Sequence, residues 1–231
     1  MQPSIRAIIV TVHLALSAVQ GDQGLAPAFG STRTAAARHS VRAVRCQAPV
    51  KPHDVESLLA EVDHAMACLL DYRVKGDVET KGKHDRFTVY FKAPNLVRID
   101  AHDGQVAVQP DGSIRGRLGH GLFGRISRAI SRDDKRLKDD EGIPFYDSHF
   151  PAVIARLWHK VKEGAPATMH EEATCYQLEV REDKTVWKYA FDKTTLCLTE
   201  DSKWVDSRQV ETAHYTNFKA NTGLSSGLFK F

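Results

Sequence analysis

Apolar residues recur at steps of three and four in two segments of the chain, a pattern that predicts two amphipathic helices. The first begins near Pro52 and Asp54 and is expected to end near Asp71–Tyr72. The second begins at Pro151 and ends at Gly164, a residue type that often follows the last turn of a helix. The apolar positions are Val55, Leu58, Leu59, Val62, Ala65, Met66, Leu69 and Leu70 in the first helix, and Val153, Ile154, Leu157, Trp158 and Val161 in the second.

Alternation of apolar and polar residues predicts short strands in the stretch after each helix. These strands are expected over residues 73–80, 86–92, 95–101 and 105–109, and again over residues 173–181, 185–192, 195–202 and 209–217. The short connections between them are rich in turn-forming residues, which is typical of antiparallel neighbours. Successive strands without intervening helices argue against a Rossmann or TIM-barrel fold. The sequence therefore predicts an α+β fold with a single curved antiparallel sheet and helices against one face.

Residues 111–142 interrupt the alternating pattern and form an insert with six Gly and eight Lys or Arg. A short helix is expected over Leu122–Ile130. Between Ser113 and Arg132 there are five Arg and no acid, interleaved with Leu, Phe and Ile. This composition suits an anionic surface such as phospholipid headgroups, and a solvated mobile loop is the alternative. The candidate residues for contact with an anionic surface are Arg115, Arg117 and Arg125.

The N-terminus has the order of charge and hydrophobicity that is typical of a cleaved signal peptide. The apolar run Ala7–Val19 follows Arg6 and is too short to span a bilayer, and Asp22 is a suitable first residue after cleavage. The Ala- and Arg-rich stretch Ser31–Arg45 also suits an organellar transit peptide or a disordered leader. We expect a signal peptide at 1–21, a disordered basic leader at 22–51 and the folded domain at 52–231, exported to the periplasm or cell envelope.

Composition and charge exclude several classes of protein. Hydrophobic residues make up 42% of the chain and charged residues 26%, and the net charge is +3. Since five Arg and one Asp precede Lys51, the remainder of the chain is almost neutral, and nothing favours a nucleic-acid partner. The four cysteines lack the spacing of a zinc ribbon or a thioredoxin site, and we interpret them as buried free thiols in preference to a disulfide between Cys175 and Cys197. The cysteines are Cys46, Cys68, Cys175 and Cys197.

Motifs that carry catalysis or hold cofactors are not found in the sequence. It contains no phosphate loop, no nucleophile elbow and no HExxH helix, and the mixed-charge segment Asp133–Glu141 lacks the spacing of a calcium loop. We therefore assign no catalytic residue, no metal ligand and no cofactor, and we expect the protein not to be an enzyme.

Two passages resemble a known family. Phe91–Ile99, followed by the Asp103-Gly104 and Asp111-Gly112 turns, resembles the LolA/LolB-like lipoprotein-carrier superfamily. The C-terminal stretches Tyr189–Leu196 and Tyr215–Leu224 look like the end of an uncharacterised bacterial branch of outer-membrane lipoprotein-sorting-like proteins. The resemblance extends over roughly 52–231 and implies a half-barrel whose concave face is plugged by helices.

The resemblance also implies a function. Its members hold lipidated or otherwise apolar ligands in the concave face, where burial of each methylene group contributes about 0.8 kcal/mol. We expect a cell-envelope carrier or binding protein for an acyl-chain or lipoprotein-like ligand, with an anionic membrane as a second partner. The alternative for each wall residue is that it simply packs against the helices. The candidate wall residues are Phe87, Val89, Phe91, Val97, Ile99, Trp187, Tyr189 and Phe191.

Two other classes of function remain open at the level of sequence. One is an enzyme whose site is assembled from distant residues, with the Arg-rich insert holding an anionic substrate. The other is a structural domain whose groove is filled and which binds another protein. The sequence gives neither the identity of the ligand nor the oligomeric state.

Overall fold

The structure is a computed structural model that describes residues 51–80, 82–102, 104–118, 126–134, 137, 144–147 and 149–231. The expected signal peptide and leader, Cys46, Arg125 and the Asp103 turn position lie outside these ranges. The predictions made for them therefore stay predictions.

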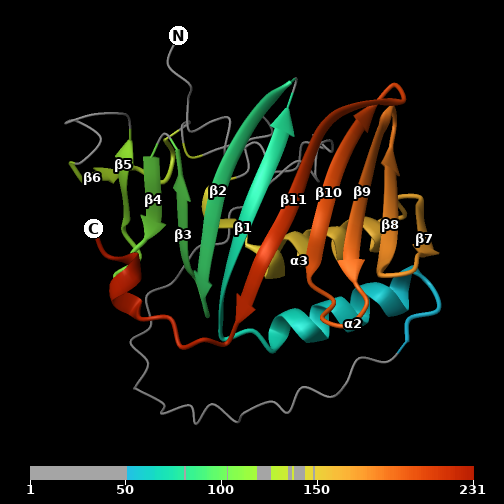
Figure 1. The fold of residues 1–231 in the computed structure, drawn as a ribbon, viewed down its shortest axis with the longest axis horizontal. Helices are drawn as coiled ribbons and strands as arrows, with labels where there is room; N and C mark the ends of the chain where they lie inside the picture. The colour runs from blue at the N-terminus through green and yellow to red at the C-terminus, as the bar shows by residue number, and fades with distance from the viewer. Residues whose placement is uncertain are drawn as a thin grey trace.

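The described strands form one 11-stranded sheet in the order β6-β5-β4-β3-β2-β1-β11-β10-β9-β8-β7 (Figure 1). Two meanders, β1–β6 and β7–β11, are joined where the first strand pairs antiparallel with the last. The edges are β6 and β7, so the sheet is not closed. The strands are β1 (Asp71–Thr80), β2 (Lys83–Lys92), β3 (Leu96–Ala101), β4 (Gly104–Val108), β5 (Ile114–Leu118), β6 (Arg128–Ile130), β7 (Ala167–Glu171), β8 (Cys175–Glu182), β9 (Thr185–Asp192), β10 (Leu198–Val205) and β11 (Arg208–Ala220).

Helix α2 (Val55–Ala67) begins with a capping box. The Asp54 carboxylate accepts a hydrogen bond from the Ser57 backbone N–H at 2.8 Å, and the Ser57 hydroxyl accepts one from the Asp54 backbone N–H at 3.0 Å. The predicted end near Asp71–Tyr72 is wrong, because the Leu70 backbone N–H donates instead to Asn221 Oδ1 at 2.7 Å. This long-range contact ends the helical pattern although the apolar spacing continues.

Helix α3 (Phe150–Lys162) confirms the second predicted helix. His149 is its N-cap, and its Nδ1 accepts a hydrogen bond from the Ala152 backbone N–H at 3.2 Å. Gly164 lies just beyond the last turn with a φ of +94°, a conformation that glycine adopts without steric cost.

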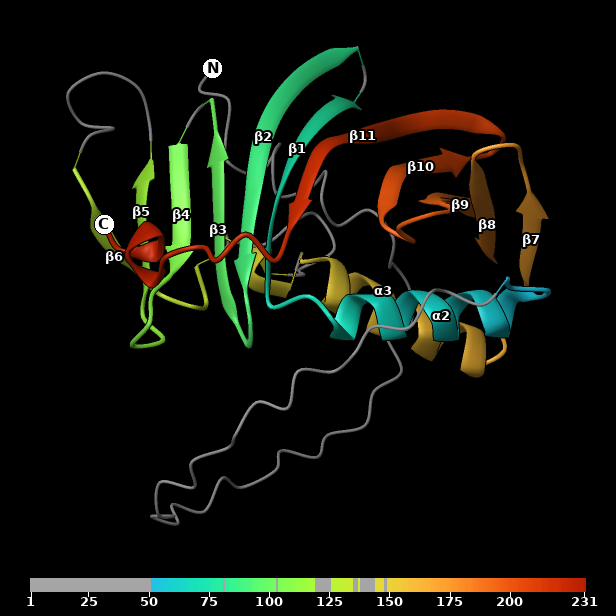
Figure 2. The same cartoon turned by 60° about the horizontal axis from the view of Figure 1, so that its bottom comes forward.

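Both helices lie against the inner side of the curved sheet (Figure 2). Their buried residues join the buried residues of the strands in one hydrophobic core. The predicted α+β fold, a curved antiparallel sheet with helices on one face, is confirmed. The helix residues in this core include Leu58, Leu59, Val62, Met66, Phe150, Val153, Ile154 and Leu157.

The insert adds strands to the sheet. Residues 114–118 and 128–130 form β5 and β6, so the helix expected over Leu122–Ile130 is wrong at its described end. The physical reason is that Ile114 and Ile130 are paired in register and both buried, which ties this segment to the sheet edge. Strand β7 was also not predicted, because its residues are mostly polar and only its pairing with β8 defines it.

The C-terminal motif that carried the family resemblance acts as a structural clasp. The buried Asp71 carboxylate accepts hydrogen bonds from the backbone N–H groups of Thr222, Gly223 and Leu224 at 2.9–3.1 Å and from the Thr222 hydroxyl at 3.2 Å. The chain then forms the short helix η4 (Ser226–Phe229), which contacts β3. The clasp therefore fixes the end of the last strand to the start of the first.

Candidate functional site

The eight predicted wall residues all lie on the inner face of the sheet and are at most 3% exposed. Cross-strand pairs in β2 and β3 place Val89 opposite Ile99 and Phe91 opposite Val97. On β9, alternation directs Trp187, Tyr189 and Phe191 to the same inner face, as every second residue of a strand requires.

Aromatic residues that sequence reasoning missed connect the two parts of this wall. The Tyr72 ring stacks on Phe91 at 5.3 Å, on Phe150 at 5.2 Å and on Phe218 at 5.4 Å between ring centroids. Its hydroxyl accepts a hydrogen bond from the Phe150 backbone N–H at 2.9 Å, and burial raises the pKa of Tyr72 well above its usual value. Tyr72 thus fixes the first turn of α3 to the centre of the sheet.

His149 adds to the same contact. Its ring lies against Phe91, with 4.8 Å between ring centroids. Burial, together with the nearby Arg156 charge, lowers the pKa of His149 to about 4. The imidazole is therefore neutral at physiological pH, which leaves Nδ1 free to accept the helix-capping hydrogen bond.

The helices occupy almost the whole inner face next to β9 and β10. The space left there is too small for even a water molecule, whereas ligand pockets begin at roughly 300 Å³. An acyl chain can enter only if α2 and α3 move away from the sheet. The space is lined by Val62, Met66, Phe150, Val153, Ile154, Phe191, Leu196 and Leu198.

A buried polar pair lies further along the same face. The Tyr215 hydroxyl donates to Asp201 Oδ2 at 3.2 Å, and the two residues are 7% and 8% exposed. Burial raises the pKa of Asp201 to about 8, so this side chain is a neutral carboxylic acid at pH 7. Glu211 lies nearby and is 4% exposed, and its Oε2 accepts a hydrogen bond from the Thr80 hydroxyl at 2.8 Å. Sequence alternation did place these residues on strands, but it gave no sign that polar groups would face inward.

Arg115 and Arg117 lie on β5 and not on a loop. Arg115 Nε donates to the Ser127 hydroxyl at 3.2 Å, and the Arg117 guanidinium lies 5.3 Å from the ring centroid of Phe231. Alternation puts both arginines on the same face of β5, opposite the buried Ile114. The structure therefore brings Arg115 and Arg117 together on the outer face, and Arg125 lies outside the described residues.

The outer face also carries a shallow hollow of about 480 Å³. Three of its charged groups are engaged in ion pairs: Arg86 Nε lies 3.0 Å from Asp77 Oδ2, and Asp100 Oδ1 lies 2.6 Å from Arg98 Nε. Neither Arg115 nor Arg117 lines this hollow, so the insert and the hollow are separate features.

One of the cysteines that we expected to be free thiols is oxidised. Cys68 is disulfide-bonded, so the interpretation is wrong for this residue. Cys175 and Cys197 are both free, as we expected, and Cys197 is buried whereas Cys175 is only half-buried. Burial raises the pKa of the Cys197 thiol to about 11, which keeps this residue protonated and unreactive.

The described residues contain neither a candidate metal cluster nor a membrane-spanning helix. Within this part of the chain, no group of three or more His, Cys, Asp or Glu side chains could hold a metal ion. The helices described are each too short or too polar to cross a bilayer.

No family model matches the chain, and no curated protein matches it. Solved structures do resemble it in shape. A DUF1329 family protein from Desulfovibrio piger is 14% identical, with a TM-score of 0.37 over 76% of this chain and 95% of that one. MucB is 12% identical, with a TM-score of 0.48 over 75% of this chain and 61% of that one.

The similar structures also include an outer membrane lipoprotein-sorting protein domain from Vibrio parahaemolyticus. It is 11% identical, with a TM-score of 0.33 over 76% of this chain and 95% of that one. The fold class itself is established by the sheet and helices of this chain.

Proposed function

We propose that this protein binds an apolar ligand, an acyl chain or a lipidated protein, on the inner face of its sheet and acts as a carrier or binding protein without catalysis. The observation that carries the proposal is the inner face itself. Aromatic and aliphatic side chains line it from β3 to β9, and two helices of 13 residues, α2 and α3, cover its part next to β9 and β10.

Ligand binding at such a site exchanges contacts with the helices for contacts with the acyl chain. The inner-face side chains are buried against α2 and α3 in the closed state, and an acyl chain replaces the helices as their apolar partner. Each methylene group that leaves water contributes about 0.8 kcal/mol, so a long chain offsets the contacts that the helices lose.

Two features support the cell envelope as the site of action. Cys68 is disulfide-bonded, and structural disulfides persist mainly in oxidising compartments such as the periplasm. The apolar run Ala7–Val19 has the length of a signal-peptide core. In this proposal Arg115, Arg117 and Arg125 contact the anionic membrane from which the ligand is taken or to which it is given.

A second candidate function is a protein-interaction domain. The small space beneath α2 and α3 favours this second function. If the helices always fill the inner face, only the outer surface of the protein can bind a partner. The two functions differ in whether the inner face ever receives a ligand.

The test uses the full-length protein, stripped of lipid, and a fluorescent acyl probe. Ile154 is 1% exposed and lines the space beneath α2 and α3, which is too small for a phenyl ring, so Ile154→Phe should strain the closed state, favour displacement of the helices and strengthen probe binding about tenfold. The matched control is Ala155→Phe, which adds the same ring at an exposed position of α3 and should leave binding unchanged. Absence of saturable binding by the wild-type protein, or equal binding by both variants, would overturn the proposal.

A further inference from the structure

The inner face of the sheet changes from apolar to polar along its central strands. The register places Thr80 opposite Glu211, Glu211 opposite Lys203, and Lys203 opposite Trp187. These four residues, from β1, β11, β10 and β9, form one line across the inner face, which we call the polar row. Trp187 lies four residues from Phe191 on β9, so the row is about 13 Å from the space beneath the helices.

Contacts within the polar row satisfy most of its groups. The Thr80 hydroxyl donates to Glu211 Oε2 at 2.8 Å, and the Lys203 ammonium lies 4.5 Å from the ring centroid of Trp187. The Trp187 indole Nε1 is buried and has no hydrogen-bond acceptor among the described residues. Buried polar groups are almost always paired, so an unpaired donor calls for an acceptor from outside the chain, a water molecule or a ligand.

The charges around this donor favour an oxygen-bearing group. Lys203 stands opposite Glu211, so the row carries one basic and one acidic side chain. Asp201 lies two residues before Lys203 on β10 and faces the same side of the sheet. It is hydrogen-bonded to Tyr215, and burial raises its pKa to about 8, which keeps it neutral at pH 7. An acceptor group next to Trp187 therefore meets an N–H donor and an ammonium without a net negative charge to repel it.

We propose that the polar row binds the headgroup of the ligand, and that this headgroup is the carboxylate or ester oxygen at the end of an acyl chain. The inference rests on the proposed function, since the chain itself would lie along the apolar part of the same face. Trp187 Nε1 donates a hydrogen bond to the headgroup oxygen, and the Lys203 ammonium adds an electrostatic contact when the headgroup is a free carboxylate.

The experiment compares three ligands of equal chain length on the lipid-free, full-length protein: dodecanoic acid, its methyl ester and dodecane. Trp187→Phe keeps an aromatic ring but removes the N–H donor. It should weaken binding of the acid and the ester about tenfold and leave dodecane binding unchanged. Lys203→Gln distinguishes a free carboxylate from an ester. If the site selects a free carboxylate, this variant should weaken binding of dodecanoic acid alone. If the site selects an ester, it should weaken binding of neither the acid nor the ester.

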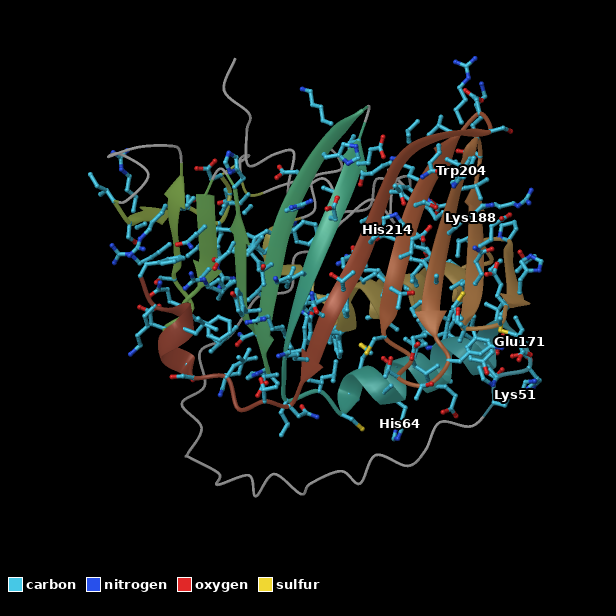
Figure 3. The ribbon with its side chains drawn as sticks, viewed as in Figure 1. Lys51, His64, Glu171, Lys188, Trp204 and His214 are labelled. Atoms are coloured by element: carbon cyan, nitrogen blue, oxygen red, sulfur yellow. The ribbon has the colours of Figure 1, made fainter. Side chains whose placement is uncertain are left out.

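The chain offers a matched control on the opposite face of the same strands. The Lys188 ammonium lies 5.1 Å from the ring centroid of Trp204, and both residues are labelled in Figure 3. Trp204→Phe and Lys188→Gln should change none of the three affinities. If Trp187→Phe weakens all three ligands alike, or none of them, the headgroup assignment is overturned while the proposed function stands. If the wild-type protein binds none of the three, both fail.

Discussion

At the scale of single residues, the inner wall is a packed core in the closed state. Phe91 is 3% exposed and Trp187 is 2% exposed. Replacing either by Ala should lower the free energy of unfolding by about 3–5 kcal/mol, because the surrounding side chains cannot fill the volume that is lost. Chemical denaturation measures this, with the exposed Lys75→Ala as control, expected within about 0.5 kcal/mol of wild type. A loss of only about 1 kcal/mol for Phe91→Ala would show that the ring lines an open groove.

Asp201 gives the protein a predictable dependence of stability on pH. Its pKa is raised to about 8 by burial, whereas an unfolded Asp titrates near 3.9. Between these values the folded state holds a proton that the unfolded state has lost, so this group lowers stability as pH rises, by up to about 1.4 kcal/mol per pH unit. Asp201→Asn should remove this slope and gain stability over wild type from pH 4 to pH 8. Parallel stability curves for the two proteins would mean that Asp201 is ionised in the fold.

At the scale of elements, the sequence predicted the helices and strands whose formation depends on neighbouring residues. The helices followed from apolar spacing and capping residues, and eight strands from alternation. The end of α2 did not, because it depends on Asn221, which reaches Leu70 from the far end of the chain. The same holds for Tyr72, whose role depends on a contact with Phe150 that no sequence spacing shows.

Strand β5 changes the expected effect of the Arg-rich insert. Replacing Arg115, Arg117 and Arg125 together by Gln should reduce binding to vesicles of anionic phospholipid, since each basic residue near such a surface contributes about 1 kcal/mol. Binding by the wild type should weaken with salt, because the Debye length is roughly 8 Å at physiological ionic strength. Vesicle sedimentation at low and high salt measures both effects. Undiminished binding by the triple variant would show that these arginines do not contact the membrane.

At the scale of the whole molecule, the sequence predicted the class of fold but not the state of its site. The apolar alternation of β2, β3 and β9 correctly indicated one curved sheet with an apolar inner face. It could not show that α2 and α3 leave no room for a ligand beneath them, because that space depends on how side chains from several elements pack together. Nor could it show the polar row, which exists only through the register of four strands.

The central claim is that the helices move aside and the inner face receives an acyl chain. The most direct measurement is photo-crosslinking of the lipid-free, full-length protein with an acyl chain that carries a diazirine near its middle, followed by mass spectrometry of the labelled peptides. The account predicts labels on inner-face residues such as Phe191 and Leu198 and on the facing residues of α2 and α3, with competition by unlabelled dodecanoic acid. Labels confined to the outer-face hollow around Lys75 and Arg86, or no label above background, would contradict it.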